Sequence, residues 1–544
     1  MNYLKGTGRL IQLALRRDRV KLLVSLGSFA ILIPLMMAGV KEIFPSSQER
    51  IQGIAFLTAN PVIRLFGLPT GDGLGHLLML RSFTMIAIIA GLISTFLVIR
   101  HTRQNEEVGR SELVRSGIVG RHSALVSALI LAVAVNVLIA ALVTIGLLTG
   151  GEDLSTHGSV AMGAGVGLVG IAFAGLAAVC AQVMQTSKGA NNLAAASVAG
   201  SFLVSGLGSL LGQIKSSGVA VEPTWLIWAS PFGWAQMIKP FADNNWWMLL
   251  VFAVFFLLCL IVAWMLASRR DDGQGVLNAR TGESEASRFL LSSTGLTWRL
   301  NKGAFLGWLV SIATLSVIYG MVAADVEDLM SQAEGIAEIF LSTTGSEEII
   351  LAYLGAIMAI MGVLVLVYAA QLALRLRAEE KRALEFMLSA SLGRFKFMIT
   401  QITFIILTSA VMLLVAGIGV GLSASMSLEA LDNILPEVLI GASIQLPAIL
   451  LIIGLITATF AYLPKLSVSL SWMIMSISII FSPFFSSLFN LPGWVVNISP
   501  LAHTPAVPPI DNIEYAPIII LSLIAIFLFV LSFLGFKSRD LQVD

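Results

Sequence analysis

Residues 246–267 read WWMLLVFAVFFLLCLIVAWMLA, an apolar run without one charged side chain. A helix that crosses the hydrocarbon core of a bilayer, about 30 Å thick, needs about 20 such residues. Because no water is present there to pair the backbone N–H and C=O groups, a run of this kind must pair them within a helix. Residues 246–267 therefore predict a membrane-spanning α-helix.

The same criterion finds eleven further runs, so that each half of the chain has six. They lie near 22–40, 82–99, 123–149, 160–185, 191–213, 303–324, 350–373, 398–422, 436–463, 466–489 and 516–536. The composition agrees, because 57% of the 544 residues are hydrophobic and 12% are charged, whereas soluble domains carry about 25% charged residues. The sequence predicts an all-α polytopic membrane protein with about 12 transmembrane helices.

Lysine and arginine are distributed unevenly between the loops. With both termini in the cytoplasm, the cytoplasmic segments hold 27 of the 33 Lys and Arg residues. The outer side keeps Lys41, Arg50, Arg64, Arg81, Lys215 and Lys239, and in the second half only acids such as Asp325, Glu327, Asp328, Glu347 and Glu348. Because basic residues accumulate in cytoplasmic loops, this asymmetry predicts cytoplasmic termini. The net charge of +1 gives no indication of a nucleic-acid partner.

Two loop segments repeat each other. Residues 106–121 read EEVGRSELVRSGIVGR and residues 379–394 read EEKRALEFMLSASLGR. Aligned at a constant offset of 273, they are identical at Glu106/Glu379, Glu107/Glu380, Glu112/Glu385, Ser116/Ser389, Gly120/Gly393 and Arg121/Arg394. Each segment follows the second predicted helix of its half on the cytoplasmic side. The offset is close to half the chain length and indicates a tandem duplication.

A second repeat lies on the outer side, between the fifth and sixth helices of each half. Trp225, Ser230 and Pro231 correspond to Trp494, Ser499 and Pro500. Halves with an even number of helices form parallel repeats related by an axis along the membrane normal. We therefore expect a first six-helix half at 1–267, beginning with an interfacial helix at 6–21, then a cytoplasmic linker at 268–293 and a second six-helix half at 294–544.

The cytoplasmic segments have the pattern of docking helices. Within each copy, Glu, Ser and Gly follow one another at intervals of four residues and so share one helical face. These residues are Glu112, Ser116 and Gly120 in the first copy, and Glu385, Ser389 and Gly393 in the second. Such a face suits two copies of one partner. The alternative is a pair of solvated loops whose arginines only set the topology.

Several chemistries have no counterpart in the sequence. The predicted spans lack central Asp, Glu, Lys and Arg, the usual relays of ion-driven transporters. No G-x-x-x-x-G-K-[ST] phosphate loop, no metal-ligand spacing and no nucleophile–base set is present, so neither an enzyme nor a metal site is predicted. Asn136, Gln182 and Gln445 are expected to be hydrogen-bond partners between helices.

Together these features resemble the permease subunit of bacterial ABC-2-type ABC exporters. The chain is most similar to the twelve-helix "exporter of polyketide antibiotics" multidrug permeases, which are encoded beside a separate ATPase gene. The resemblance covers nearly the whole chain, with E-E-x4-E-x3-S-x3-G-R at 106–121 and 379–394 and W-x4-S-P at 225–231 and 494–500. It implies an ATP-driven exporter of amphiphilic drugs or antibiotics in the bacterial plasma membrane.

The resemblance also implies roles for particular residues. In such exporters the inner segment is a coupling helix seated in the nucleotide-binding subunit, so that this chain would bind two copies of a cytoplasmic ABC ATPase. One copy would contact Glu106, Glu107, Glu112, Ser116, Gly120 and Arg121, and the other Glu379, Glu380, Glu385, Ser389, Gly393 and Arg394. ATP and Mg²⁺ would bind the ATPase, with no cofactor on this chain. Gly109 and Arg110 align with Arg382 and Ala383, so the two docking surfaces are not identical.

The outer elements with Trp225, Ser230, Pro231, Trp494, Ser499 and Pro500 resemble short helices that close the exit. A pathway between the halves would expose Met85, Phe202, Met358 and Met473 to an apolar substrate, since methionine and aromatic side chains adapt in shape; ordinary packing is the alternative for these four. Two other functions stay open: a major-facilitator-like secondary transporter, which shares the parallel six-helix repeats, and an ABC exporter of a lipid or glycolipid.

Overall fold

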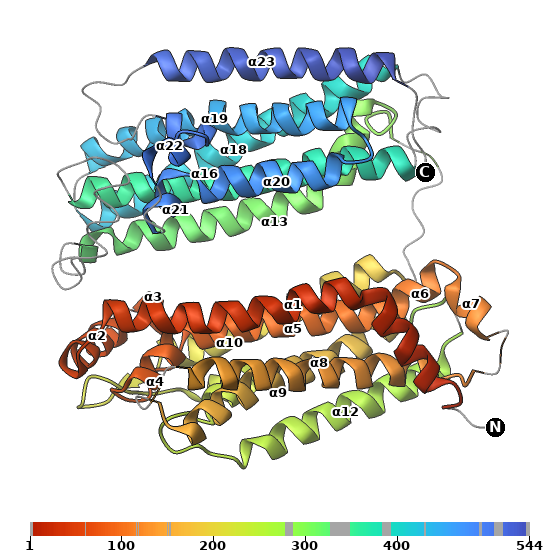
Figure 1. Ribbon diagram of the computed structural model, residues 1–544, viewed down its shortest axis with the longest axis vertical. Coiled ribbons are helices and arrows are strands. Elements are labelled where there is room, and N and C mark those ends of the chain that lie inside the picture. The colour runs from red at the N-terminus through yellow and green to blue at the C-terminus, as the bar shows by residue number, and fades with distance from the viewer. Residues whose placement is uncertain are drawn as a thin grey trace. The chain divides into compact units, whose positions relative to one another are not determined.

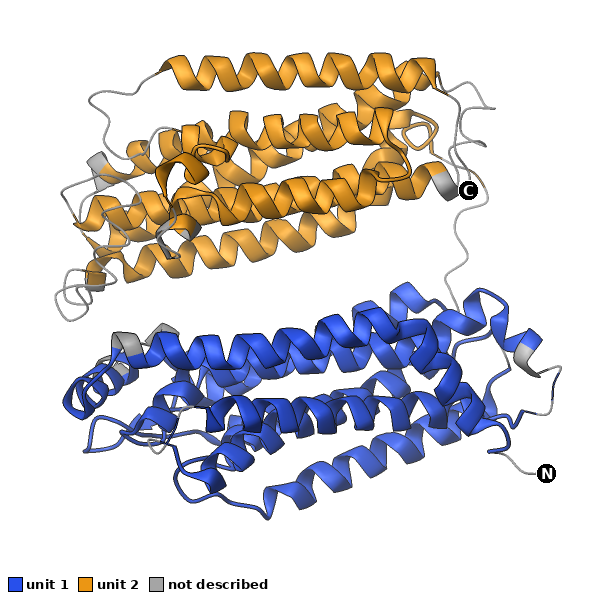
Figure 2. Ribbon diagram, in the orientation of Figure 1, with its two compact units in different colours: residues 1–282 blue, residues 283–544 orange. Residues whose placement is uncertain are grey.

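The protein is described here by a computed structural model, in which the chain forms two compact units, Met1–Gly282 and Glu283–Asp544 (Figure 2). The boundary lies inside the segment 268–293. The structure describes residues 4–59, 61–115, 117, 119–149, 151, 154–271, 273–277, 285, 287–326, 349–382, 393–428, 431–488, 492–504 and 515–539.

Six long helices make up the first unit (Figure 1). They are α1 (Thr7–Ile43), α5 (Thr84–His101), α8 (Ser123–Leu148), α9 (Thr156–Val183), α10 (Ser187–Leu210) and α12 (Met248–Arg269). Shorter elements connect them: α2 (Ser47–Ala59), α3 (Pro61–Phe66), α4 (Leu74–Leu78), the π-helical turn η1 (Met79–Phe83), α6 (Arg103–Glu107), α7 (Arg110–Arg115), the hairpin β1 (Gln213–Ile214) and β2 (Val221–Glu222), η3 (Trp225–Ala229) and α11 (Pro231–Gln236).

The second unit contains α13 (Ser293–Met321), α16 (Ile349–Arg382), α18 (Arg394–Ser427), α19 (Leu431–Tyr462), α20 (Ser467–Ile480) and α23 (Tyr515–Ser538). Its short elements are η4 (Val322–Asp325), α21 (Pro483–Leu488), α22 (Gly493–Val496) and η5 (Pro500–His503). Ser292 caps the N-terminus of α13, where its hydroxyl accepts a hydrogen bond from Gly295 N at 3.0 Å.

Both units pack their helices in the same order. In the first unit α8 packs on α1 and α9, and α9 also packs on α5 and α12. In the second unit α18 packs on α13 and α19, and α19 also packs on α16 and α23. The second and fourth helices are the most buried of each unit, whereas the first and sixth are mostly exposed. The outer helices therefore present apolar faces to lipid.

Small residues allow the close packing of α9. Gly163 and Gly167 lie directly against the main chain of α8, where an added Cβ would come within 2.6 Å of Ala140 O and 2.8 Å of Asn136 O respectively. Close backbone approach of this kind is the usual basis of helix association in lipid. The Asn136 side chain donates to Ser94 Oγ of α5 at 2.7 Å, which confirms the predicted interhelical hydrogen bond.

Eleven helices of the described residues are long and apolar enough to cross a membrane, which confirms the all-α polytopic fold. The run predicted at 466–489 differs. It forms α20, of 14 residues, and then a turn at Phe481 and Ser482 before α21 begins with Pro483. Proline has no N–H group for a continuing helix and favours the first helical turn, so the apolar run is divided.

The N-terminal region also differs from its prediction. Residues 6–21 do not form a helix separate from the first span, because α1 is continuous over 37 residues. At 1.5 Å per residue it is about 55 Å long, more than the hydrocarbon core requires. Its N-terminal part turns away from the axis of the remainder (Figure 1), so the basic residues of this part lie on an extension of the first span.

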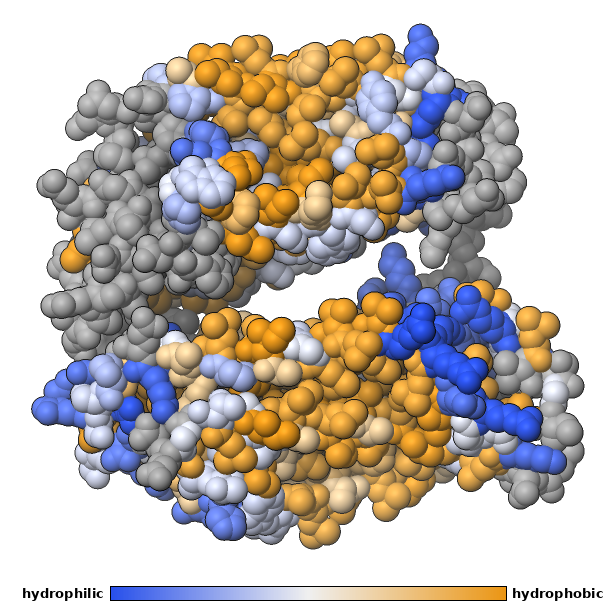
Figure 3. Space-filling model, viewed as in Figure 1, coloured by the Kyte–Doolittle hydropathy of each residue, from blue (hydrophilic) through white to orange (hydrophobic). Residues whose placement is uncertain are grey.

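The two ends of each unit differ in chemistry. Hydrophilic residues gather toward the ends of the face shown in Figure 3, with apolar residues between them. We call the end at which α5 and α16 terminate, with Arg103 and Arg377, the basic end. The opposite end, with Trp225 in the first unit and Trp494 in the second, is the tryptophan end.

Candidate functional site

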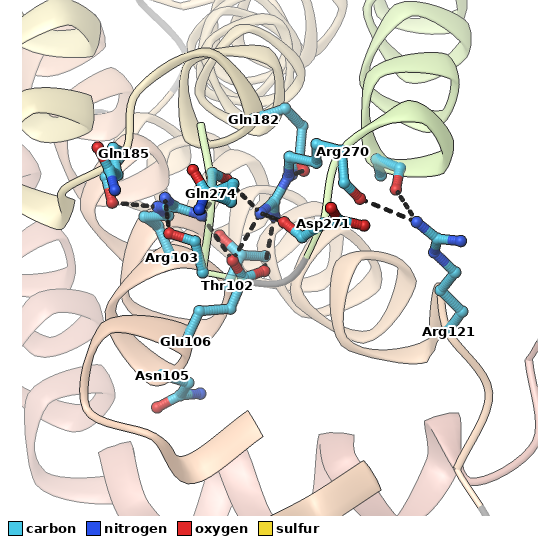
Figure 4. Close-up of polar contacts among 12 residues, drawn as sticks. Thr102, Arg103, Asn105, Glu106, Arg121, Gln182, Gln185, Arg270, Asp271 and Gln274 are labelled. Carbon is cyan, nitrogen blue, oxygen red and sulfur yellow. Dashed lines mark hydrogen bonds and ion pairs between the residues drawn. The ribbon is translucent and has the colours of Figure 1, made fainter. Parts of the chain in front are cut away.

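A carboxylate held between two arginines lies at the basic end of the first unit (Figure 4). Glu106, on α6, binds Arg103 Nη1 at 2.7 Å, and both of its oxygens bind Arg270, with Oε1 at 2.7 Å from Nη2. Arg103 is 1% exposed and the Glu106 side chain 10%. Such charge-assisted, two-pronged contacts are stronger than neutral hydrogen bonds.

The same two guanidinium groups also hold the chain beyond α12. Further acceptors complete their hydrogen bonding: the side chain of Gln182 at 2.6 Å and the main-chain oxygens of Gln185, Gly273 and Gln274 at 2.7–3.0 Å. Val276 N and Leu277 N donate to Gln182 O and Val183 O. Part of the segment expected to be a cytoplasmic linker is therefore fixed to the first unit.

Arg121 caps the C-terminus of α12, the last helix of the first unit. Its Nη2 donates to Ala267 O at 3.2 Å and to Arg270 O at 2.9 Å, at the C-terminus of α12 (Figure 4). The last carbonyl groups of a helix lack partners within it and carry partial negative charge. The Arg121 guanidinium thus connects the segment after the second helix to the end of the sixth.

The second unit repeats both arrangements. Glu380, whose side chain is 0% exposed, binds Arg377 at 2.7 Å and Arg539 at 2.8 Å. Arg394 donates to Lys537 O and Arg539 O at the end of α23. Each unit therefore has one buried Arg–Glu–Arg cluster and one arginine that caps its sixth helix.

These contacts correct the alignment of the two segments. Glu106 and Glu380 occupy equivalent places and differ by 274 in number, whereas the alignment at 273 pairs Glu106 with Glu379. Glu379 is partly buried instead beside Gln401, which donates to it at 3.4 Å. The capping arginines do differ by 273, so the second copy is one residue shorter between the cluster and the cap.

The two segments differ in backbone as well. In the first unit α6 ends at Glu107, Gly109 adopts a left-handed conformation with φ +74°, and α7 follows. Glycine enters this conformation without a steric penalty. In the second unit α16 continues as one helix to Arg382. The chain thus turns at Gly109 in the first unit, whereas the aligned Arg382 is still part of helix α16 in the second unit.

The predicted docking residues fall into two groups. Glu106, Glu380, Arg121 and Arg394 are engaged within their own units, and the carboxylate of Glu107 accepts from Ser187 N at the start of α10 at 2.9 Å. Glu112 is exposed on α7, together with Val108 and with Leu113, which is 78% exposed. Gly120 N donates to Lys5 O, and Gly393 precedes α18. Ser116, Glu385 and Ser389 lie outside the described residues.

The outer elements are equivalent at the tryptophan end. The hydroxyls of Ser230 and Ser499 donate to Ser201 O and Ser478 O, each at 2.7 Å, and accept from the N–H groups of Phe232 and Leu501. Pro231 and Pro500 begin the short helices α11 and η5. Trp225 and Trp494 are 75% and 72% exposed. An indole exposed at the end of a span is typical of a membrane interface.

The comparisons with known proteins cover nearly the whole chain. Residues 290–537 match a family profile described as "Multidrug efflux system permease Rv1217c, C-terminal domain". The multidrug efflux system permease protein Rv1217c of Mycobacterium tuberculosis (strain ATCC 25618 / H37Rv) is 30% identical over 545 residues, which is 99% of this chain and 95% of that protein. The chain belongs to this family of multidrug efflux permeases. The resemblance to ABC-2-type permeases is thereby confirmed.

Four residues of the candidate site of the permease were not among those predicted from the sequence: Arg103, Arg270, Arg377 and Arg539. A signal for them exists. In both halves an arginine stands three residues before the buried glutamate, and another follows the last apolar run almost at once. Among the described residues of the permease, no group of His, Cys, Asp or Glu is placed to hold a metal ion.

The four candidate substrate residues of the permease lie in different surroundings. Met85 on α5 and Met473 on α20 are about half exposed, at 53% and 51%. Phe202 on α10 is partly buried and packs on Phe66, with ring centroids 5.6 Å apart. Met358 is 2% exposed within the core of the second unit. Packing accounts for Met358, and only Met85 and Met473 present substantial surface.

Proposed function

We propose that this chain is the membrane permease of an ATP-driven exporter that moves amphiphilic drugs or antibiotics out of a bacterial cell. The observation that carries the proposal is the similarity to a multidrug efflux system permease over 99% of the chain, which includes both six-helix halves. The duplicated basic end supports a partner with two equivalent binding sites. A separate cytoplasmic ABC ATPase, in two copies, fits that requirement and would bring ATP and Mg²⁺.

The docking surface on the first unit is α7 with the turn before it. Val108, Glu112 and Leu113 are exposed there, whereas Glu106 and Arg121 are engaged inside the unit. The inward contacts would hold the segment in place, and the exposed side chains would meet the ATPase. An interface with an apolar centre and a charged rim has this composition. The matching surface of the second unit would include Glu385.

For the substrate we propose an apolar or amphiphilic small molecule. The pathway candidates with exposed side chains, Met85 and Met473, suit a partner of variable shape because methionine is flexible and polarizable. Closure at the outer side would involve the elements that begin at Ser230 and Ser499, each fixed to its fifth helix by a buried hydroxyl.

The test of this function is ATP-dependent transport by the chain with its ATPase. We expect the purified chain alone to show no Mg²⁺-dependent ATP hydrolysis, and the pair in proteoliposomes to move a hydrophobic dye only with ATP. Transport by the chain alone, driven by a proton or sodium gradient, would contradict the proposal and favour a secondary transporter.

We also propose that the chain lies in the plasma membrane with both basic ends in the cytoplasm. Cysteines introduced at Ser111, on α7, and at Leu384 should resist a membrane-impermeant thiol reagent in intact cells and react after the membrane is permeabilised. Cys180 and Cys259 are buried and give a low background. A cysteine at Trp225 is the matched control and should react in intact cells. Labelling of either basic-end position from outside would reverse the orientation.

A further inference from the structure

A cavity of about 260 Å³ lies at the basic end of the first unit. It is enclosed by α1, the end of α5, the α6–α7 segment and the start of α8. Much of its wall is apolar and consists of Leu10, Leu13 and Ala14 from α1 and Ala124 and Ala128 from α8. A dry cavity of about 150 Å³ accommodates benzene, so this one has room for a larger group than an aromatic ring.

The charged side chains on the wall leave a positive excess. Arg17 and Arg110 both line the cavity, and their like charges repel each other. Glu106, the carboxylate among the described lining residues, is already bound by Arg103 and Arg270. The two lining arginines therefore lack an acid of their own in the wall.

Asp18, on α1, is the nearest further acid to Arg17. Its carboxylate lies 2.6 Å from His101 Nε2 and 2.9 Å from Arg100 Nη2, but 3.9 Å from Arg17 Nε. Arg17 also donates to Asn105 Oδ1 at 2.9 Å. Two other basic side chains thus hold Asp18 more closely, and the Arg17 guanidinium keeps the capacity to bind an anion.

Among the described residues of the second unit, a much smaller space is lined by side chains at equivalent positions. It lies between α13, the end of α16 and the start of α18 and measures about 20 Å³. At the offset of 273, Ala124 and Ala128 are replaced by the larger Phe397 and Gln401, both of which line the smaller space. At these two positions the first unit has small side chains beside its cavity, whereas the second unit has larger ones.

We propose that the cavity of the first unit binds the headgroup of one anionic phospholipid from the surrounding membrane. A phosphodiester accepts charge-assisted hydrogen bonds from arginine, and basic pockets between transmembrane helices suit anionic headgroups. Leu13, Val20 and Val24 are exposed and recur at helical spacing with Arg17. The acyl chains would lie along this stripe of α1 while the phosphate lies at Arg17 and Arg110.

This site goes beyond the proposed function and does not depend on it. The bound lipid would contact the α6–α7 segment, which contains the turn at Gly109. The docking segment of the first unit would then be stabilised by lipid.

The test is lipid retention measured by native mass spectrometry after reconstitution in phosphatidylcholine with phosphatidylglycerol. We expect the natural protein to keep one phosphatidylglycerol that Ala128→Gln, which copies the second unit, loses. Ala124→Ser is the matched small change and should keep it. Folding is checked by the melting temperature in phosphatidylcholine alone, where all three proteins should agree. Equal retention by the natural protein and Ala128→Gln would overturn the proposal.

Charge is tested with a pair of neighbours on α1. Arg17→Gln should weaken phosphatidylglycerol retention on the order of fivefold, the effect of one basic residue at a membrane surface. Arg16→Gln changes the net charge equally but does not line the cavity, and it should match the natural protein. Excess soluble glycerol phosphate should not displace the lipid; complete displacement would mean that the cavity binds phosphate compounds without an acyl chain. Equal losses of phosphatidylglycerol from both variants would mean that arginine attracts the lipid only through general surface charge, which would overturn the proposed site.

Discussion

Glu106→Ala is expected to lower the free energy of unfolding of the first unit by about 3–5 kcal/mol. The carboxylate lies between Arg103 and Arg270 at 2.7 Å from each and is nearly buried. Its removal leaves two guanidinium groups without a counter-ion in a place from which water is largely excluded, and an unpaired buried charge costs more than the pair contributes. Glu380→Ala should likewise destabilise the second unit, because it removes the buried ion pairs with Arg377 and Arg539.

The measurement is thermal unfolding in nanodiscs, where we expect the melting temperature to fall on the order of 10 °C. Glu112→Ala is the matched control, because it removes an exposed carboxylate of a neighbouring helix and surface charges contribute about 0–1 kcal/mol. If Glu106→Ala and Glu112→Ala had the same melting temperature, the Arg–Glu–Arg cluster would not contribute to stability. The prediction would then be wrong for both units.

Membrane spans are the part of this fold that a single sequence determines best. Backbone groups in hydrocarbon must pair within a helix, so an apolar run such as 516–536 predicts α23 without knowledge of its neighbours. The rule fails at 466–489, where apolar composition continues through Phe481 and Pro483 although the helix does not. Hydropathy measures the solvent that a residue prefers and is insensitive to the backbone restriction at a proline.

The sequence predicts where residues of the candidate site lie along the chain, but it does not predict which residues they contact. The repeat marks Glu106 and Arg121, but it cannot show that Glu106 meets Arg270, 164 residues further along the chain. A repeat in sequence is compatible both with an external partner and with an internal contact made twice. The one-residue change of register is likewise invisible until Arg103 and Arg377 show which glutamates are equivalent.

Charge reversal in the docking segments, by Glu112→Arg and Glu385→Arg, is expected to uncouple the permease from the proposed ATPase partner. Each single variant should lower the drug-stimulated ATPase activity of the complex, and the two together should abolish export. Glu112 is exposed and so is accessible to a partner protein. A carboxylate that accepts a charge-assisted hydrogen bond in a docking cleft would be replaced by a cation facing the same donor. Breaking such an interface pair costs about 2–5 kcal/mol, enough to weaken binding by a factor of tens or more.

The two single variants should differ in how much ATPase activity they lose. Glu112 follows Gly109, a residue that adopts a turn, whereas the residue aligned with Gly109 is Arg382, within α16, so we expect the first segment to adjust more easily. We therefore expect a smaller loss from Glu112→Arg than from Glu385→Arg. Arg16→Glu, which changes an exposed charge at the same basic end in the opposite direction, separates a specific contact from a general change of potential. Normal coupling in the double variant, at normal expression and melting temperature, would show that these segments only set the topology of the chain.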